Sequence, residues 1–561
     1  MRAITAGSAT ITATSAADPS KTARADITVT AGSDVNLDVP LVYLTQSIQT
    51  RDGRIPLVAG KATVARVFVR GSRSGLGNAA VRLRVFQGAA LAGTVTGTAI
   101  VGTTLDEGCC AAVIAIPDNL IRDGNTYVAD VDPDNAVAES NEGDNAWPLT
   151  GTSKPMRVVT VPPINVQLVP IRHRTTGLVG PSSTTITNQL KQMYPLSTVN
   201  VTVHPEYATD TPPLTDGASW IGMLREIEGL RALEASNAYY YGVLNQVAAN
   251  GIIGIANLSG FVGLGIGGPE DQAAETLTHE FGHSFGRQHA PSPGCGAPAN
   301  VDPGFPRADG TIGAYGYDLL TNTVYSSGRF DIMGYCNNTW ASDYTYLGIL
   351  AYLRSGVIPI TASVARVAPV LLITGAAVGG AVDVDPVFST TIVPTPPRAS
   401  GRFVAEGLAS DGRLLFRHRF DGSEIGDADP GARTFLAAVP YDAAVTGAVA
   451  SITVRDVSGG SRAAVRARTG TYSSVPGEIS LRLDADPQLA VRSSGANRFT
   501  VSWSASRYPA LVVRNRRTGR VLGIGRRGSM AIEATALTEL DALLSDGVGS
   551  TTRALALTEA P

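Results

Sequence analysis

The chain lacks several features that would assign it to a familiar class of protein. None of its 561 residues belongs to an apolar run of about 18 or more, the length that a membrane-spanning helix needs, so we expect no transmembrane segment. The formal net charge is only −3, which argues against a general affinity for nucleic acid or for anionic membranes. Charged residues make up 17% and hydrophobic residues 44% of the chain, as in globular domains and not in disordered chains.

The N-terminus lacks the apolar core of a signal peptide. Residues 1–5 lead directly into an alternating pattern typical of strands. We therefore expect the sequence to be a fragment, or a chain whose leader has been removed. Its cellular location has to be inferred from other features.

Cysteine is scarce, with four residues in the chain. None shows the C-x-x-C spacing of a cysteine-based zinc site. Cys109 and Cys110 are adjacent, and a bridge between neighbours is strained. The pair can equally be a core thiol and its neighbour, so its pairing stays open.

Histidine is also scarce, yet three of the six histidines fall within residues 279–289. This segment reads HEFGHSFGRQH and matches H-E-x-x-H-x-x-G-x-x-H at every fixed position. On a helix, His279 and His283 share one face about 6 Å apart and can hold one metal ion. If the helix continued, His289 would lie about 9 Å beyond His283 along the axis. Zn–N bonds are only about 2.1 Å long, so His289 could not then bind the same ion. The helix must therefore end, and Gly286, which takes a left-handed cap without a Cβ penalty, marks the expected turn.

Three neutral histidines leave a fourth position open for water, which is typical of catalytic and not of structural zinc. Glu280 follows His279, so its carboxylate lies beside the metal and can take a proton from water as a general base. The alternative is a solvent-exposed helix that is rich in histidine. Five fixed positions in so histidine-poor a chain favour the metal site. We predict that His279, His283 and His289 bind one catalytic zinc and that Glu280 is the base.

The same segment resembles the zinc signature of the metzincin metalloproteases. That family has a methionine turn downstream, under the zinc, and residues 331–336 (DIMGYC) look like it, with Met333 as the matching residue. In some metzincins a tyrosine two residues after the methionine approaches the metal, and Tyr335 has that position. The resemblance implies that Tyr335 binds zinc or stabilises the transition-state oxyanion. The alternatives are ordinary core packing for Met333 and a buried hydroxyl bonded to backbone for Tyr335.

Cys295 follows the zinc motif, and Cys336 follows the methionine turn. Both should lie near the metal, so we expect a disulfide between them that fastens the loop after the helix to the methionine turn. The alternative is two buried free thiols. A disulfide would imply an oxidising compartment, and we therefore expect a secreted or cell-surface protein.

The strand and helix patterns predict several domains around the motif. We expect the tail of an immunoglobulin-like β domain at 1–37, a β-sandwich at 38–152, the zinc domain at 153–362 and one or two further sandwich domains at 363–561. The fold class is an α+β, metzincin-like catalytic domain flanked by all-β, immunoglobulin-like sandwiches. The resemblance implies a twisted sheet with two long helices above the cleft. It also implies an edge strand, which we place within 251–266, that binds an extended peptide by β-augmentation.

Two further patterns carry weaker indications of binding. The acidic and asparagine-rich residues 130–145 resemble the end of bacterial adhesion-type domains and could bind Ca²⁺ through carboxylates; a solvated hairpin rich in Asx turns is the favoured alternative. The arginines of 514–527 could bind anionic glycans, although such a run is more often a solvated face. The expected partner is a protein or peptide substrate, with a glycoprotein as one form of it and no nucleic acid, and the oligomeric state is left open.

These observations favour a secreted zinc endopeptidase that hydrolyses peptide bonds of proteins. The alternative is a surface or matrix adhesin in which the zinc domain is minor or inactive, and hydrolysis of a non-peptide amide by the same chemistry is a third hypothesis. A competing match, G-x-S-x-G around Ser284, lies inside the expected zinc helix. A serine nucleophile needs a sharp strand-to-helix turn instead, so Ser284 is not expected to be one.

Overall fold

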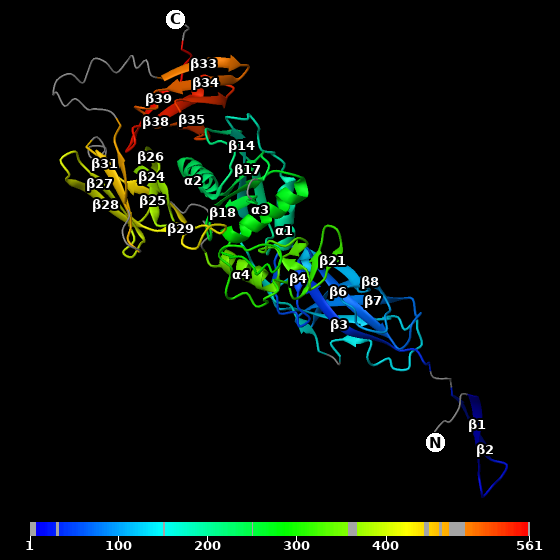
Figure 1. Ribbon diagram of the computed structural model, residues 1–561. Coiled ribbons are helices and arrows are strands. Elements are labelled where there is room, and N and C mark those ends of the chain that lie inside the picture. Colours follow the sequence, from blue (N-terminus) through cyan, green and yellow to red (C-terminus); the bar gives the residue numbers. More distant parts are fainter. Residues whose placement is uncertain are drawn as a thin grey trace. The chain divides into compact units, whose positions relative to one another are not determined.

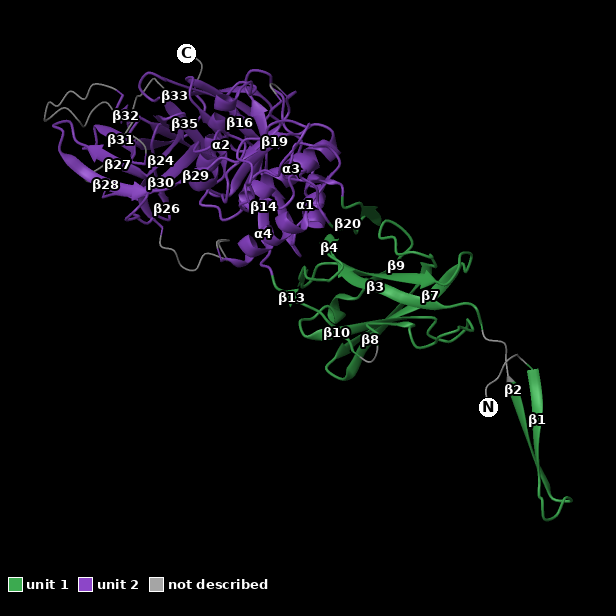
Figure 2. Cartoon of the chain, turned by 60° about the horizontal axis from the view of Figure 1, so that its bottom comes forward, with its two compact units in different colours: residues 1–160, 314–327 green, residues 161–313, 328–561 purple. Residues whose placement is uncertain are grey.

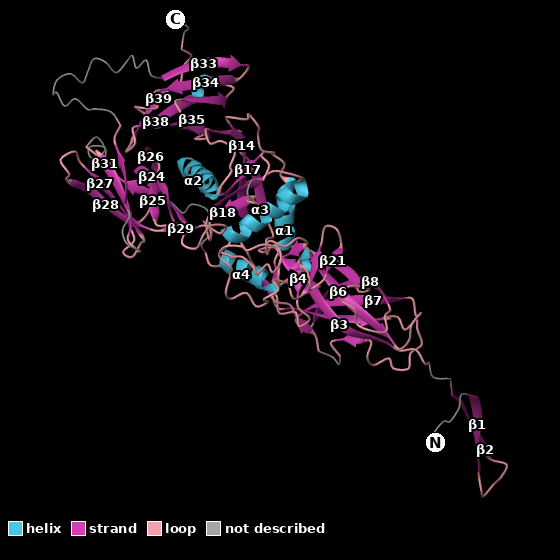
Figure 3. Ribbon diagram, in the orientation of Figure 1, coloured by secondary structure: helices cyan, strands magenta, loops and turns pink. Residues whose placement is uncertain are grey.

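The computed structural model of the chain describes residues 7–29, 33–149, 152–248, 251–356, 367–442, 448–458, 463–469 and 489–558. Strands are far more numerous than helices in the described residues (Figure 3). The chain forms two compact units, one made of 1–160 with 314–327 and the other of 161–313 with 328–561 (Figure 2). Among the described helices, none has the length and apolar character to cross a membrane. The domain boundaries given above stay predictions.

The first unit is built from strands, and in some of them, such as β7 and β9, buried residues occur at every second position. In β7, for example, Val81, Leu83 and Val85 are fully buried while their neighbours are not, as expected where one face of a sheet covers a core. Two sheets share this core, one in the order β3-β6-β9 and the other β11-β10-β7-β8 with β12 beside β10. The strands of the unit's main part are β3 (Leu37–Thr45), β4 (Ile48–Gln49), β5 (Leu57–Val58), β6 (Thr63–Gly71), β7 (Asn78–Gln87), β8 (Ala90–Ile100), β9 (Ala112–Ile116), β10 (Asn125–Val131), β11 (Ala146–Trp147), β12 (Lys154–Pro155) and β13 (Val158–Val159).

Two other pieces belong to this unit. The strands β1 (Gly7–Thr14) and β2 (Thr22–Val29) form an antiparallel hairpin. From the stretch after the third histidine, β20 (Tyr315–Asp318) pairs with both β4 and β21 (Thr323–Tyr325). Residues 314–327 therefore do not belong to the unit that holds the zinc motif.

The second unit contains a mixed sheet in the order β18-β19-β17-β14-β16-β36-β35-β38-β39, with β15 also paired to β14. Figure 1 labels its strands β14, β17, β18, β35, β38 and β39. The strands from the chain's middle are parallel to one another except for the edge strand β18. C-terminal strand β36 continues the sheet by pairing with β16, an association that sequence patterns did not indicate. The bounds are β14 (Ile164–His173), β15 (Val199–Val203), β16 (Tyr207–Thr209), β17 (Tyr239–Leu244), β18 (Gly254–Ala256), β19 (Val262–Ile266), β35 (Ala510–Asn515), β36 (Val521–Gly525), β38 (Leu540–Ser545) and β39 (Ser550–Ala554).

The glycine-rich stretch 251–266 forms a hairpin of β18 and β19, and not a single strand. Its outer member β18 is the edge of the sheet. In β19 the large residues Val262, Leu264 and Ile266 face the core that includes α2, whereas Gly263 and Gly265 lie against α3. This alternation lets α3 approach the sheet closely on one face while the other face is filled with apolar side chains.

Two of the four α-helices of the described residues, α2 and α4, begin at a side-chain cap. In α2 (Gly217–Leu233), Asp216 and Ser219 form a reciprocal capping box. Its residues at helical spacing are all fully buried, namely Trp220, Met223, Leu224, Ile227 and Leu230. Helix α4 (Asp343–Arg354) is capped by Ser342, whose side chain accepts from Thr345 N–H. The remaining helices are α1 (Asn188–Met193) and α3 (Glu270–Ser284).

Helices α2 and α3 lie on opposite faces of the sheet. Successive side chains of a strand point to opposite faces, and in β17 Tyr240 belongs to the core cluster of α2, whereas Tyr239 and Tyr241 contact Phe281 of α3. The expectation of two long helices on the cleft side therefore fits α3 alone. On that side α3 also contacts the short helix α1.

The remaining C-terminal strands form further sheets with cores of their own. One pair of sheets, β25-β24-β30-β29 with β26 beside β24 and β28-β27-β31-β32, shares a core that includes Phe403, Phe420 and Phe435. The sheet β33-β34-β37 shares a second core with β35 and β38. The bounds are β24 (Ala368–Val378), β25 (Ala381–Val384), β26 (Phe388–Ile392), β27 (Phe403–Leu408), β28 (Leu414–Phe420), β29 (Gly422–Glu424), β30 (Arg433–Pro440), β31 (Ser451–Asp456), β32 (Ala463–Ala467), β33 (Leu489–Gly495), β34 (Arg498–Trp503) and β37 (Ser529–Glu533).

A carboxyl group at the contact of α2 with β30 predicts a pH-dependent stability. Glu228 accepts a hydrogen bond from the Thr434 hydroxyl at 2.8 Å, while its second oxygen is buried without a partner. Burial raises the pKa of Glu228 from 4.5 to about 7, against the opposing effects of Thr434, Arg225 and Arg231. The unfolded chain then releases this proton before the folded chain does, so the free energy of unfolding falls as pH rises from 4.5 to 7.

Glu228→Gln keeps an acceptor for Thr434 and removes the titration. The variant should gain about 1–3 kcal/mol over the parent above pH 8 and nothing below pH 4. Urea unfolding of both chains between pH 4 and 8.5 measures the difference. If the free energies of unfolding of the two chains differ by the same amount at every pH in that range, ionisation of Glu228 does not destabilise the fold.

Candidate metal centre

Helix α3 carries the first two histidines of the motif. Pro269 precedes it, and the acids Glu270 and Asp271 lie in its first turn, where they favour a helix start. The helix ends at Ser284, Gly286 takes a positive φ of 80°, and its N–H donates to His283 O at 2.8 Å. The turn predicted at Gly286 is therefore confirmed, and it brings His289 back toward the helix.

Backbone carbonyls fix the orientation of all three imidazoles. The Nδ1 of His279 lies 2.7 Å from Ile332 O, that of His283 lies 2.6 Å from Arg287 O, and that of His289 is bonded to the Ala299 carbonyl. A carbonyl oxygen only accepts, so each Nδ1 carries the proton and each Nε2 has a lone pair free for a metal.

The free nitrogens converge on one point with a fourth group, Asp427. The ligand atoms of these four residues lie within 4.8 Å of one another. His283 Nε2 and His289 Nε2 are 3.2 Å apart, and neither bears a hydrogen to share, so this contact is not a hydrogen bond. Asp427 Oδ1 lies 3.1 Å from His289 Nε2 and 3.8 Å from His279 Nε2.

These separations fit a tetrahedral metal ion. Bonds of about 2.1 Å place the ligand atoms of a tetrahedral site about 3.4 Å apart. The four side chains are at most 12% exposed, and converging lone pairs in so buried a place repel one another unless a cation lies between them. The group can thus hold a metal ion. Acidic and histidine side chains of the other described residues form no comparable group, including the acidic loop after β10 for which Ca²⁺ binding was considered.

Glu280 lies beside the four-residue group. It is only 3% exposed, and its Oε2 is buried without a hydrogen-bond partner. Burial raises the pKa of the Glu280 carboxyl well above its usual value, and the neighbouring Asp427 carboxylate raises it further. The helix thus places a carboxyl group next to the converging nitrogens and outside the four-residue group.

Burial and mutual contact shift the pKa values of the other groups as well. Burial lowers the pKa of His283 to about 4, which keeps its imidazole neutral and able to bind a metal. Burial alone would raise the pKa of Asp427, but the three histidines hold it well below its usual value. An ionised carboxylate and neutral imidazoles are the forms that bind metals.

Met333 and Tyr335 both lie near the group. Met333 is 1% exposed, its sulfur is 3.8 Å from the Tyr194 hydroxyl, and a Cβ built on Gly282 would overlap that sulfur. Met333 thus packs directly against α3. The Tyr335 ring lies 5.0 Å from that of His289, centre to centre, and its hydroxyl donates to Asp427 Oδ1 at 3.4 Å. Tyr335 is 41% exposed, so its hydroxyl is not the buried, backbone-bonded group of the alternative interpretation.

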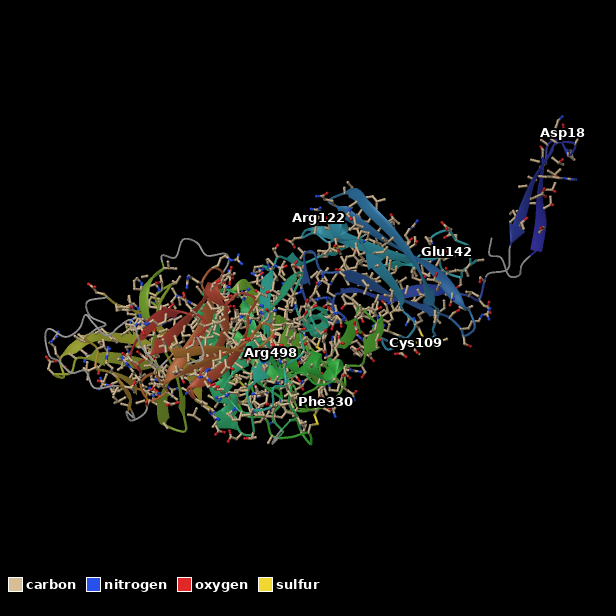
Figure 4. The ribbon with its side chains drawn as sticks, turned by 90° about the horizontal axis from the view of Figure 1, so that it is seen from above. Asp18, Cys109, Arg122, Glu142, Phe330 and Arg498 are labelled. Atoms are coloured by element: carbon tan, nitrogen blue, oxygen red, sulfur yellow. A yellow bond between two sulfur atoms is a disulfide. The ribbon has the colours of Figure 1, made fainter. Side chains whose placement is uncertain are left out.

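Cys295 and Cys336 form the predicted disulfide, and Cys109 and Cys110 are bonded to each other in the other unit (Figure 4). The Cys295–Cys336 bridge joins the loop that carries His289 to the turn that carries Met333. It spans 41 residues of chain, for which the chain-entropy relation gives a stabilisation of about 4 kcal/mol.

Reduction of this bridge, or replacement of both cysteines by serine, should lower the midpoint of thermal unfolding and weaken metal binding. The Cys109→Ser/Cys110→Ser chain is the matched control, since the bridge it removes joins adjacent residues and closes no loop. Differential scanning calorimetry with and without added Zn²⁺ measures both effects. An unchanged midpoint in the Cys295→Ser/Cys336→Ser chain would show that the bridge does not hold the loop.

Comparisons with known proteins do not identify the chain. No family model matches it, and no curated protein matches it. Among solved structures, a chaperone–substrate complex is 12% identical over 44% of this chain and 38% of that one, with a TM-score of 0.23. A β-glycosidase from Bacteroides vulgatus is 10% identical over 92% of this chain and 79% of that one, with a TM-score of 0.14. Scores this low carry no argument about fold or function.

Sequence reasoning missed Asp427. It lies 138 residues after His289, in the link between β29 and β30, and no spacing rule connects it with the motif. Its local sequence, Gly-Asp-Ala-Asp-Pro, indicates only a turn. Ser284, by contrast, lies at the last position of α3 and not at a strand-to-helix turn, as expected of a residue that is no nucleophile.

Proposed function

We propose that the chain is a zinc-dependent endopeptidase of metzincin type that acts on extended segments of proteins. The observation that carries this proposal is the convergence of three lone-pair nitrogens beside a carboxyl group outside the converging set, Glu280, next to the edge strand of a sheet. Three imidazoles favour zinc over the oxygen-preferring ions Mg²⁺ and Ca²⁺. The two disulfides support a secreted or cell-surface location.

The residues of the chain divide the chemistry among them. His279, His283 and His289 would hold a zinc ion, which would act as a Lewis acid and lower the pKa of a bound water to about 7. Glu280 accepts the proton from that water and passes it to the leaving nitrogen. The Tyr335 hydroxyl can donate to the oxyanion that develops on the scissile carbonyl. The backbone of β18 offers the groups with which an extended peptide pairs.

Asp427 favours a second candidate function. With its carboxylate in place the group has four protein ligands, which is the arrangement of a structural metal site. A surface adhesin with an inactive metal domain would have such a site. Glu280 argues against this alternative, because a structural site needs no additional buried carboxyl group beside the ligands.

Cleavage of a reduced and alkylated protein tests the proposal. The purified chain should cut it, lose the activity on treatment with a chelator and recover it with one equivalent of Zn²⁺. Mass spectrometry of the fragments shows whether peptide bonds are cut. The Asp427→Ala chain lacks the fourth protein ligand. If this chain also binds one zinc and cuts no unfolded protein, the structural-site alternative is supported instead.

A further inference from the structure

The segment 424–429 pairs with the free edge of the sheet. Leu258 N–H donates to Glu424 O at 2.6 Å, and Gly426 N–H donates to Ala256 O at 2.9 Å. Between these bonds Ile425 forms an antiparallel bridge with Asn257. The segment therefore pairs with the outer side of the chain at residues 256–258, where β18 ends, and the outer side of an edge strand is the side on which backbone groups are free to pair.

One side chain holds this segment from its other side. The amide nitrogen of Asn300 donates to the carbonyls of Ile425, Gly426 and Ala428 at 3.1, 3.3 and 2.8 Å. Asn300 belongs to the same loop as His289. The segment is thus fixed between the sheet edge and the loop that carries the third histidine.

The path of the segment carries Asp427 onto the metal-binding nitrogens. Gly426 passes over His283 so closely that a Cβ there would overlap the imidazole ring, and only glycine permits that approach. The next residue then places its carboxylate 3.5 Å from His283 Nε2. Water, or the carbonyl of a bound peptide, would need this same position.

Two cavities lie beside the segment. One, of about 510 Å³, has an apolar wall that includes Trp220, Ile221 and Ile255. The other, of about 450 Å³, is lined by His279, Glu280 and Tyr335 among others. Asp427 lines both cavities, so both adjoin the segment.

We infer that residues 424–429 occupy the groove in which a peptide substrate is bound, and that the chain stays closed until this segment leaves it. The inference rests on the proposed function. Once the segment has left, the groove takes an unfolded peptide that pairs antiparallel with β18. Side chains of this peptide reach into both cavities, one of which is apolar and the other polar. Two chains cannot pair with the same strand edge, so the segment and the substrate exclude each other.

Binding of a small zinc chelator measures closure without relying on catalysis. Acetohydroxamate needs the position that Asp427 fills. If the segment is out of the groove in only about 1% of parent molecules, the apparent affinity of the parent for acetohydroxamate is about 100-fold weaker than that of an open chain. Calorimetric titration of zinc-loaded protein should show at least about tenfold tighter binding for Asp427→Ala than for the parent. Asn300→Ala, which keeps all four ligands and loosens the segment, should bind the chelator more tightly than the parent as well. Asp411→Ala removes an exposed carboxylate outside the segment and should behave as the parent does.

The outcomes separate this inference from the proposed function. Tighter chelator binding in both Asp427→Ala and Asn300→Ala, with faster cleavage of unfolded protein, supports both. Tighter binding without cleavage by any variant supports the closed groove and argues against the peptidase. Equal chelator affinity in parent and Asn300→Ala, with zinc bound in each, would overturn the inference, and cleavage by the parent would then leave the peptidase intact.

Discussion

A Glu280→Ala chain should retain its zinc and lose cleavage of unfolded protein by a factor of about 10² to 10⁴, the usual contribution of a general base. Glu280 is not among the four converging groups, so its removal leaves the metal-binding nitrogens in place. The comparison is best made in both the parent and the Asp427→Ala background, because release of the segment raises the signal. Initial cleavage rates and zinc content are measured on the same preparations.

Asp271→Ala serves as the matched control, since Asp271 is an exposed acid in the first turn of the same helix. It should cleave at the parent's rate. Equal rates for Glu280→Ala and Asp271→Ala would remove Glu280 from the mechanism. A fall in activity accompanied by loss of zinc would instead make Glu280 a residue that maintains the metal site.

His289→Ala should weaken zinc binding by more than about 100-fold, since loss of an outer hydrogen-bond partner of a ligand alone costs 10–100-fold. The imidazole is fully buried, and its loop also carries Asn300, so a bound metal would tie this loop to α3. Competition with a fluorescent chelator gives the apparent dissociation constant, and thermal unfolding should show a smaller gain on zinc addition than in the parent.

His418→Ala tests whether that loss is specific. His418 lies in β28, outside the converging group, and its removal should leave the zinc affinity unchanged even if the chain is less stable. A His289→Ala chain that binds zinc as tightly as His418→Ala would mean that the third ligand comes from elsewhere.

Local features of the site followed from the sequence. The i and i+4 spacing of His279 and His283, the acids at the start of α3 and the glycine after its end act within one or two turns of backbone. The positions of these residues therefore depend on few long-range contacts. The Cys295–Cys336 pairing followed from the motifs that each cysteine flanks.

The parts of the site that could not be predicted from the sequence depend on pairing between segments far apart in the chain. Asp427 reaches the histidines because its segment pairs with β18, and β18 is an edge because 251–266 folds back as a hairpin at Ser259 and Gly260. Similarly, β36 extends the sheet by pairing with β16, far away in the chain. Strand periodicity predicts that such segments are strands, but it does not state which edge they join.

Zinc K-edge X-ray absorption of the purified chain, with metal content measured on the same sample, tests the central claim most directly. We expect one zinc per chain with three imidazole nitrogens at about 2.0–2.1 Å and one carboxylate oxygen at about 2.0–2.2 Å. The Asp427→Ala chain should replace that oxygen by water and keep the three imidazoles. A chain without zinc, or one whose zinc has fewer than three imidazole ligands, would contradict the account.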